Sequence, residues 1–228
     1  MYKNVLTPIN QAGWPFIGIF VAITIGFFMV SETLGWFGVI STLWCIYFFR
    51  DPDRITPTRD GLVICPADGV VQLIDCAVPP SELEMGTEAL PRICIFMNVF
   101  DVHVNRVPMD GVITKISYRP GRFFNASLDK ASDFNERLSL LMKTNENHEI
   151  AFVQIAGLIA RRIKCDLIEK QKVKAGQRFG LIRFGSRVDV YLPKNTQPLV
   201  CMGQRTIAAE TILADVNTSE SSRIGEVR

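Results

Sequence analysis

Two long stretches without charged side chains dominate the N-terminal part of the sequence. After Lys3 no charged residue occurs until Glu32, and after Glu32 none occurs until Arg50. Each stretch is close to the roughly 17–25 apolar residues that a membrane-spanning helix needs. Trp and Tyr side chains lie toward the ends of both stretches, as they often do at membrane interfaces. The pattern predicts a membrane-associated helical hairpin over residues 1–49, with Glu32 at its turn.

The composition of the two stretches leaves other arrangements open. A cleavable signal peptide fits poorly, because no A-x-A-like site follows and the start lacks a strong basic cluster. A buried helical pair in a soluble core would have the same composition, and the second stretch is short enough to dip into one leaflet. Two crossings of the bilayer would leave both flanks of the hairpin on the same side of the membrane. Arg50, Arg54 and Arg59, which follow the hairpin, favour the cytoplasmic side. We therefore expect a cell-membrane protein whose remaining part lies on the cytoplasmic side.

A polar, proline-containing segment over residues 50–61 marks the start of a soluble domain, which we place at residues 50–215. The polar tail at residues 216–228 is expected to be disordered. The net charge of +2 gives no argument for nucleic acid as a partner. No cysteine pair has C-x-x-C spacing, which disfavours a zinc site or a disulfide framework. Buried thiols in a reducing compartment are predicted instead for the six cysteines, Cys45, Cys65, Cys76, Cys94, Cys165 and Cys201.

Short β-strands dominate the predicted soluble domain. One helix is predicted over residues 131–143, where Phe134, Leu138 and Leu141 recur at helical spacing. The strand–helix alternation of a parallel sheet is not visible, so the predicted fold class is α+β, β-rich, with antiparallel sheets behind the apolar hairpin. The predicted strands span residues 62–65, 70–76, 93–99, 112–118, 150–155, 159–168, 187–192 and 206–214.

Two segments of the C-terminal part resemble each other. Residues 172–180 and 200–206 each contain a Gly-Gln pair that leads into a predicted strand. Paired turns of this kind are similar to the barrel-sandwich folds of lipoyl and biotinyl carriers, so the C-terminal part is expected to be barrel-sandwich-like. Such carriers expose a lysine between the repeats, whereas Gly185-Ser186 and Lys194-Asn195 stand there in this chain. A non-catalytic, membrane-anchored carrier or adaptor is one alternative for the function.

Gly185 and Ser186 stand where one apolar run meets the next, just before the predicted strand 187–192. A flexible glycine carbonyl beside a serine hydroxyl is what a self-cleaving serinolysis requires, in which the serine oxygen attacks that carbonyl. A bulge or tight turn in a sheet is the alternative, and it is the commoner reason for a lone Gly-Ser pair.

Chemistry at Ser186 would need a base for its hydroxyl proton and donors for an oxyanion. The sequence contains only two histidines, so the choices of base are few. His103 lies near the end of a predicted strand, where a structural histidine is the alternative. Asp68 lies at a turn between apolar strands, where an ordinary turn aspartate is the alternative. His148 is surrounded by polar residues and is expected to be solvated.

Six segments of the sequence form an ordered set: residues 66–69, 101–106, 121–132, 135–137, 154–163 and 184–186. They occur in the same order in the short, bacterial-type phosphatidylserine decarboxylases, which the chain resembles from about Cys45 to about Ala214. Each segment alone is a weak signal, but the ordered set is specific. The apolar hairpin agrees with the resemblance, because these enzymes act on a membrane lipid.

This resemblance implies a pyruvoyl-dependent, self-processing decarboxylase. Ser186 Oγ would attack the Gly185 carbonyl, and an N→O acyl shift followed by β-elimination would separate a β chain, residues 1–185, from an α chain, residues 186–228. Loss of ammonia would leave a covalent pyruvoyl group derived from Ser186. That group would form a Schiff base with phosphatidylserine and accept electrons as CO₂ leaves, releasing phosphatidylethanolamine without a separate cofactor.

The resemblance also implies roles for individual residues. Asp68 would orient and charge-stabilise a histidine, and Ser186 would be the nucleophile, as in an Asp-His-Ser relay. Longer relatives carry two histidines three residues apart, and the second is taken as the base. Here the first matches His103, while Arg106 stands at the second position. We therefore assign the base to His103, and expect Arg106 to contact the lipid phosphate or carboxylate.

Alternatives within the same chemistry differ in substrate. Another serine lipid, such as archaetidylserine, would fit the same residues, whereas a soluble amino-acid substrate would not require the apolar hairpin. The expected partners are a membrane phospholipid and the two cleaved chains, held together as a heterodimer that could assemble further. Neither a metal ion nor a nucleic acid is expected.

Overall fold

The computed structural model describes residues 7–121, 135–157, 162–183 and 186–226, and the chain divides into two compact units. One unit extends from the N-terminus to Asp53 and includes Phe100–Val102. The second comprises Arg54–Val99 and His103–Arg228.

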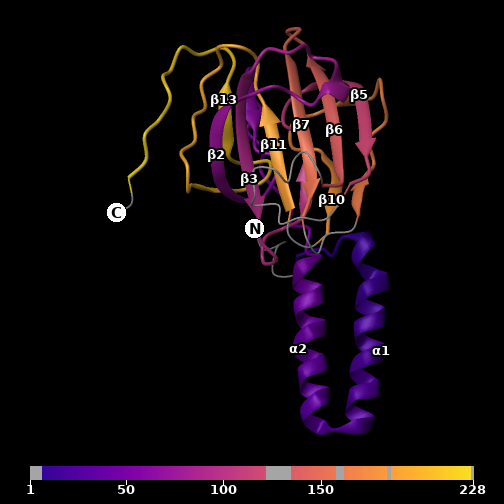
Figure 1. The fold of residues 1–228 in the computed structure, drawn as a ribbon. Coiled ribbons are helices and arrows are strands. Elements are labelled where there is room, and N and C mark those ends of the chain that lie inside the picture. The colour runs from indigo at the N-terminus through magenta and orange to yellow at the C-terminus, as the bar shows by residue number, and fades with distance from the viewer. Residues whose placement is uncertain (1–6, 122–134, 158–161, 184–185, 227–228) are drawn as a thin grey trace. The chain divides into compact units, whose positions relative to one another are not determined.

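The first unit contains the predicted helical hairpin. After a short 3-10 turn, η1 (Gln11–Gly13), helix α1 (Trp14–Val30) is joined by one residue to helix α2 (Glu32–Phe48). The helices run side by side (Figure 1). A Cβ atom at Gly38 would lie 2.8 Å from Thr24 Oγ1, and the Thr24 and Thr42 hydroxyls are 3.0 Å apart. Small and hydroxyl side chains therefore let the helices approach closely, as in membrane helix pairs.

The outer surface of this hairpin is apolar. Among the described residues, one helical segment, Gln11–Val30, is long and apolar enough to cross a bilayer. Large apolar side chains of this kind are rarely left in contact with water over a continuous surface, so the exposure favours a lipid environment. The most exposed of them are Ile25, Met29, Val30, Trp36, Phe37, Ile40 and Leu43.

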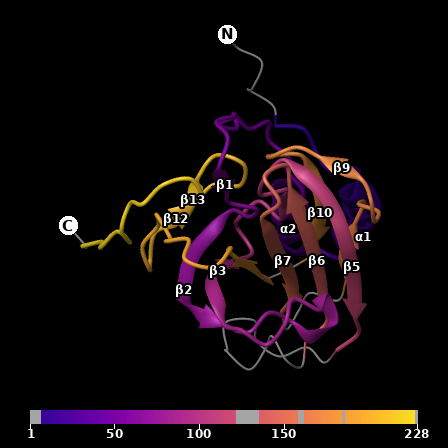
Figure 2. The same cartoon turned by 90° about the horizontal axis from the view of Figure 1, so that it is seen from above.

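The second unit is built around one eight-stranded sheet in which all neighbouring strands are antiparallel. Seen from above, the sheet curls from β2 through β3 and β7 to β5 (Figure 2). Strand β11, which contains Ser186, lies in the interior of the sheet between β3 and β7. In spatial order the strands are β12 (Arg205–Thr206), β2 (Gly69–Ala77), β3 (Leu90–Met97), β11 (Ser186–Tyr191), β7 (Glu149–Ala156), β6 (Arg137–Thr144), β5 (Gly111–Arg119) and β9 (Lys172–Val173).

Two smaller antiparallel sheets complete the second unit. One pairs β1 (Leu62–Ile64) with β13 (Ile212–Asp215), and the other has the order β4 (Val104–Arg106), β10 (Arg178–Ile182), β8 (Ile163–Cys165). Their apolar side chains join those of the large sheet in one core, where the rings of Phe152 and Phe179 meet edge to face at 5.2 Å. The observed fold confirms the predicted β-rich, antiparallel α+β class with its N-terminal hairpin.

Part of the other face of the large sheet is also covered. A 3-10 turn, η2 (Ser81–Leu83), places the buried Leu83 against Leu141, Val153 and Tyr191. Strand β6 is consequently buried on both faces.

The predicted helix over residues 131–143 is wrong for the residues that the structure describes. Arg137–Thr144 forms strand β6, paired along its length with β5 and β7, and residues 131–134 lie outside the described part of the chain. Because both faces of β6 are buried, its apolar side chains do not alternate with polar ones. Leu138 and Leu141 thus have a helical spacing by coincidence, since they lie on opposite faces of the strand.

The two similar Gly-Gln segments adopt matching turns. Gly176 and Gly203 have φ values of +76° and +81°, a conformation that favours glycine. In each turn the following glutamine side chain accepts a hydrogen bond from the backbone N–H three residues earlier, at 3.1 Å for Gln177 and 3.0 Å for Gln204. The sequence repeat therefore corresponds to a structural repeat, which leads into β10 and β12.

Candidate active site

Ser186 is the first residue of β11 and is fully buried. It lies opposite Met97 of β3 and Ala156 of β7. Its hydroxyl donates a hydrogen bond to the Met97 sulfur at 3.4 Å. Gly185 lies outside the described residues. The candidate nucleophile is therefore held at the end of an interior strand, in surroundings from which water is excluded.

The segment that contains Asp68 reaches the same end of the sheet. Strand β2 begins at Gly69, directly beside Phe96 of β3, and a Cβ atom at Gly69 would lie only 2.2 Å from the Phe96 carbonyl oxygen. A glycine is thus required for this close approach. Since Phe96 precedes Met97, and Met97 lies opposite Ser186, Asp68 enters the sheet at the end where the serine lies.

The Asp68 carboxylate is held by two described contacts. It forms an ion pair with Arg54 at 2.7 Å and accepts a hydrogen bond from the Ala208 backbone N–H at 2.8 Å. Its side chain is 13 % exposed, so both contacts are largely shielded from water. Together they fix the orientation of the carboxylate. The pairing with Arg54 was not predicted, because no sequence signal links an arginine of the linker to this turn.

His103 is fully buried and directly precedes β4. Its backbone carbonyl accepts a hydrogen bond from the Ile182 N–H at 3.3 Å, and Ile182 is the last residue of β10. Because β10 leads into β11, this contact brings the segment of His103 beside the strand that precedes Ser186. A direct Asp68–His103–Ser186 relay stays a prediction.

A buried polar network joins the three segments. Gln154 Nε2 donates to Asn105 Oδ1 at 2.7 Å, and Asn105 Nδ2 approaches the Pro66 carbonyl at 3.4 Å and the Met97 sulfur at 3.7 Å. Met97 in turn accepts from Ser186. Pro66, Asn105 and Gln154 lie in segments that the sequence analysis singled out, but no role was predicted for these residues. One sequence feature could have revealed the network. Gln154 occupies a core-facing position of a predicted strand, where an uncharged polar side chain needs a hydrogen-bond partner.

Arg106 is also buried, and its guanidinium donates to the Gly176 carbonyl at 3.0 Å. The Arg106 guanidinium group therefore lies against the turn around Gly176 that precedes β10. The predicted contact of Arg106 with the lipid headgroup stays a prediction.

A competing thiol nucleophile is disfavoured at this site. Cys65 precedes the Asp68 segment, is fully buried and lies 3.1 Å from the Ala67 carbonyl. Burial raises the pKa of the Cys65 thiol to about 12, so it stays protonated at neutral pH. Among the described residues, no group of three or more His, Cys, Asp or Glu side chains could hold a metal ion.

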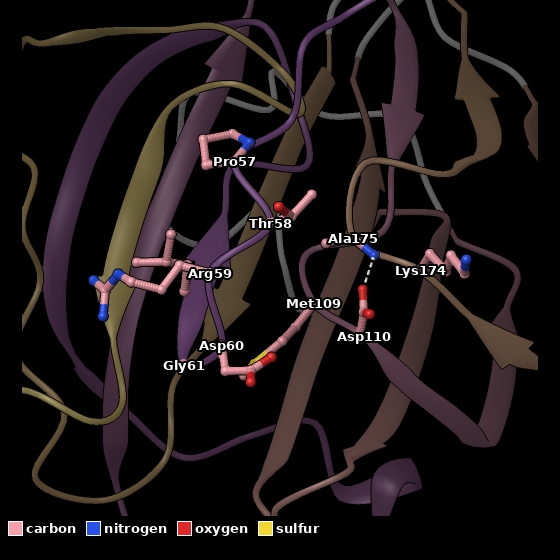
Figure 3. A pocket seen from close by; sticks show the side chains of 10 residues that line it. Pro57, Thr58, Arg59, Asp60, Gly61, Met109, Asp110, Lys174 and Ala175 are labelled. Carbon is pink, nitrogen blue, oxygen red and sulfur yellow. Dashed lines mark hydrogen bonds between the residues drawn. The ribbon is translucent and has the colours of Figure 1, made fainter.

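A surface cleft of about 310 Å³ lies at the other end of the large sheet (Figure 3). Asp110 accepts a hydrogen bond there from the Ala175 backbone N–H at 2.6 Å. The cleft adjoins the first residue of β5. The last residue of β5, Arg119, lies opposite Arg137, and this pair is at the end of the sheet where Ser186 lies. The cleft is therefore separate from the candidate active site. Its lining is Pro57, Thr58, Arg59, Asp60, Gly61, Leu62, Met109, Asp110, Lys174 and Ala175.

Comparison with known proteins gives consistent matches. The sequence model of a family described as phosphatidylserine decarboxylase matches residues 41–214. A phosphatidylserine decarboxylase proenzyme of Paramagnetospirillum magneticum is 61% identical over 226 residues, which cover 99% of this chain and 94% of that protein. Proteins of the same name from Cereibacter sphaeroides and Ruegeria pomeroyi are 54% and 55% identical, over 100% and 95% of this chain and 98% and 99% of their own lengths.

Proposed function

Because this chain belongs to the phosphatidylserine decarboxylase family, we propose that it removes the carboxyl group of phosphatidylserine and releases phosphatidylethanolamine. It is a decarboxylase of phospholipid biosynthesis, and its curated relatives are named proenzymes. The observation that carries the finer proposal is the position of Ser186, a buried serine after a glycine at the start of an interior strand. Family membership sets aside the alternative of a non-catalytic carrier or adaptor, and archaetidylserine or a similar serine lipid is the remaining alternative substrate.

In the proposed maturation, Ser186 Oγ attacks the Gly185 carbonyl carbon. The Gly185–Ser186 peptide bond breaks as an ester forms, and the released nitrogen takes up a proton. Removal of the Ser186 Cα proton then breaks the Cβ–Oγ bond, so Gly185 leaves as a carboxylate at the end of the β chain. Water replaces the nitrogen of the resulting dehydroalanine, and ammonia is released. A pyruvoyl group then caps the α chain, residues 186–228.

The surroundings of Ser186 fit such a group. A pyruvoyl group has fewer heavy atoms than the serine that it replaces, so the buried site needs no additional space. Residues from Arg187 onward remain paired with β3 and β7 and would hold the new chain end in place. The group would supply a ketone for the substrate amine and a carbonyl that draws electrons from the departing carboxylate.

The remaining roles in the reaction are proposed for three polar residues. His103 is proposed as the base for the Ser186 hydroxyl proton and as the proton carrier during decarboxylation. Asp68, held by Arg54 and by the Ala208 amide, is proposed to orient His103 and to stabilise its charged form. Arg106 is proposed to contact the lipid phosphate or carboxylate.

The apolar hairpin is proposed to anchor the enzyme in the membrane that supplies its substrate. Two helices place both flanks of the hairpin on the same side of the bilayer, and the basic residues after it favour the cytoplasmic side. The α and β chains are proposed to stay together as a heterodimer, because β11 of one chain pairs with β3 and β7 of the other.

Denaturing intact-mass spectrometry of the purified protein tests the maturation. We expect two chains split after Gly185, with the smaller one lighter than its serine form by one ammonia. Ser186→Ala should give a single uncleaved, inactive chain, whereas Ser117→Ala, a control on β5, should mature normally.

Asp68→Asn and His103→Ala should slow cleavage by about a hundredfold, within the range for a lost general base. Two fragments from Ser186→Ala would contradict serinolysis, and normal cleavage in either relay variant would remove that residue from the relay.

A further inference from the structure

A glutamine side chain is buried near Ser186 with one of its two polar atoms unpaired. Gln154 lies on β7 and is fully buried. Its Nε2 atom donates to Asn105 Oδ1 at 2.7 Å, whereas its Oε1 atom has no hydrogen-bond partner in the part of the chain that the structure describes. A buried amide oxygen without a donor lowers stability, so its presence calls for a functional explanation.

The register of the large sheet places Gln154 on the same face as Ser186. Gln154 lies opposite Val188 of β11, and Ser186 lies opposite Ala156 of β7. Residues two positions apart on a strand share a face, and Val188 and Ala156 both belong to the main core. Diagonal neighbours across such a strand pair are about 7–8 Å apart, which is within reach of a long side chain. Gln154 can therefore contact a group bound at position 186.

Asn105 connects the Gln154 amide to the serine. Asn105 Nδ2 lies 3.7 Å from the Met97 sulfur, which also accepts a hydrogen bond from the Ser186 hydroxyl at 3.4 Å. Asn105 and Met97 are both fully buried. The bond from Gln154 Nε2 to Asn105 restrains the plane of the Gln154 amide, so its Oε1 atom is held in place and not carried by a mobile surface side chain.

An acceptor oxygen discriminates among the groups of the proposed substrate. The headgroup of phosphatidylserine carries a carboxylate, a phosphodiester and an ammonium group. At neutral pH the carboxylate and the phosphodiester have no proton to donate, whereas the nitrogen has. The unpaired Gln154 oxygen therefore fits the nitrogen of the substrate and neither of its anionic groups.

We propose that Gln154 Oε1 accepts a hydrogen bond from the substrate nitrogen while that nitrogen is bonded at position 186. This assignment rests on the proposed function. When the ammonium group condenses with the pyruvoyl ketone, a C–N bond forms and the ketone oxygen leaves as water with two of the three nitrogen protons. The third proton stays on the positively charged imine nitrogen. Gln154 accepts from that N–H, and hydrogen bonds from charged donors are stronger than those from neutral ones.

The same contact distinguishes primary from secondary amines. A secondary amine also condenses with a ketone, but the imine nitrogen is then bonded to three carbons and has no proton. It leaves Gln154 Oε1 unpaired, and a site built to pair a polar group rejects an analogue that lacks the partner. Gln154 therefore favours the primary amine of a serine lipid over its N-methylated form.

The test traps amines on the mature, full-length protein in detergent. Glycerophosphoethanolamine and its N-methyl analogue are each incubated with the protein and sodium cyanoborohydride, which reduces the imine to a stable amine. The mass of the smaller chain gives the rate of adduct formation without any release of CO₂. We expect Gln154→Met to cleave normally but to trap the primary amine about tenfold more slowly than wild type, as for a lost hydrogen bond to a charged group.

Two comparisons serve as controls. Gln154→Met should trap the N-methyl analogue at the wild-type rate, because that imine has no N–H to lose. Gln171→Met makes the same substitution in the segment before β9, where the Gln171 side chain accepts from the Ile168 N–H at 3.0 Å. It should match wild type with both amines.

The opposite results overturn the assignment. Equal trapping of the primary amine by wild type and Gln154→Met would show that the oxygen is not used, and equal losses with both amines would show a change in the shape of the site. A Gln154→Met chain that stays uncleaved would assign the residue to maturation or folding instead. If wild-type protein traps neither amine, the proposed function itself fails, and this assignment fails with it.

Discussion

Arg187, which follows Ser186 in β11, is a charged residue with a buried side chain. The Arg187 side chain is 2 % exposed, and its guanidinium makes two hydrogen bonds to Asp189 at 2.5 and 2.8 Å and one to the Cys94 sulfur at 3.0 Å. Arg187→Met would leave the buried Asp189 carboxylate with Arg92 at 3.6 Å. We expect the free energy of unfolding to fall by about 3 kcal/mol, the cost of breaking a buried ion pair. Chemical denaturation of the uncleaved Ser186→Ala chain in detergent measures this. Lys143→Met, at an exposed site on β6, is the control, and equal stability of the two variants would contradict the prediction.

Individual site residues differ in how far the sequence could identify them. Ser186, Asp68 and His103 stand in segments whose order is specific to the family, so they could be named as candidates. The contacts that hold them could not, because Arg54 with Asp68 and Gln154 with Asn105 are pairs of residues far apart in the chain. Their proximity depends on which strands become neighbours, and local residue patterns do not determine that.

At the scale of elements, the prediction fails at β6, where burial of both faces removes the alternation of polar and apolar residues. Strands β2 and β5 each have one less buried face and were predicted as strands, whereas β6 is buried on both faces and was taken for a helix. The second face of β6 is covered by η2, and Glu82 of η2 makes the polar contact between them. It accepts two hydrogen bonds from Arg137, both at 2.7 Å, and one from Ser139 at 2.9 Å.

This contact predicts a pH dependence for the docking of η2. Burial alone would raise the pKa of Glu82, but the hydrogen bonds from Arg137 and Ser139 outweigh it and lower the pKa below its ordinary value of 4.5. A folded-state pKa below the unfolded one means that the contribution to stability is present above pH 4.5 and is lost as the pH falls through the folded value. At pH 7 we expect Glu82→Gln to be less stable than wild type by about 2 kcal/mol, as for a lost charged hydrogen bond.

The difference between wild type and Glu82→Gln should shrink as the pH falls below 4.5, where the wild-type carboxyl also becomes neutral. Denaturant unfolding at a series of pH values measures it. Glu149→Gln, at an exposed position of β7, corrects for the general effect of removing a negative charge. A difference that stays constant down to low pH would show that Glu82 acts through packing and not through its charge.

For the whole molecule, the sequence supports the division into an apolar hairpin and a β-rich domain but not the arrangement of the sheet. The alternation in residues 187–192 identified β11 as a strand, yet its interior position between β3 and β7 joins segments about ninety and thirty residues away in the chain. That position matters for the proposed maturation. A strand paired on both sides is held by two neighbours when the peptide bond before it is cut, whereas an edge strand would be held by one neighbour.

The membrane orientation of the whole molecule can be tested with a cysteine that it already carries. Cys76 on β2 is exposed, whereas Cys65 and Cys94 are buried. If the hairpin crosses twice and the domain is cytoplasmic, a membrane-impermeant maleimide should label Cys76 in inside-out vesicles and leave it unlabelled in right-side-out vesicles. Cys76→Ser should remove most of the label and thereby identify its site, because Cys165 and Cys201 are only partly exposed. Labelling confined to right-side-out vesicles would place the domain outside the cytoplasm. The basic residues at the end of the hairpin would then not determine its orientation, and the lipid would have to be reached from the opposite leaflet.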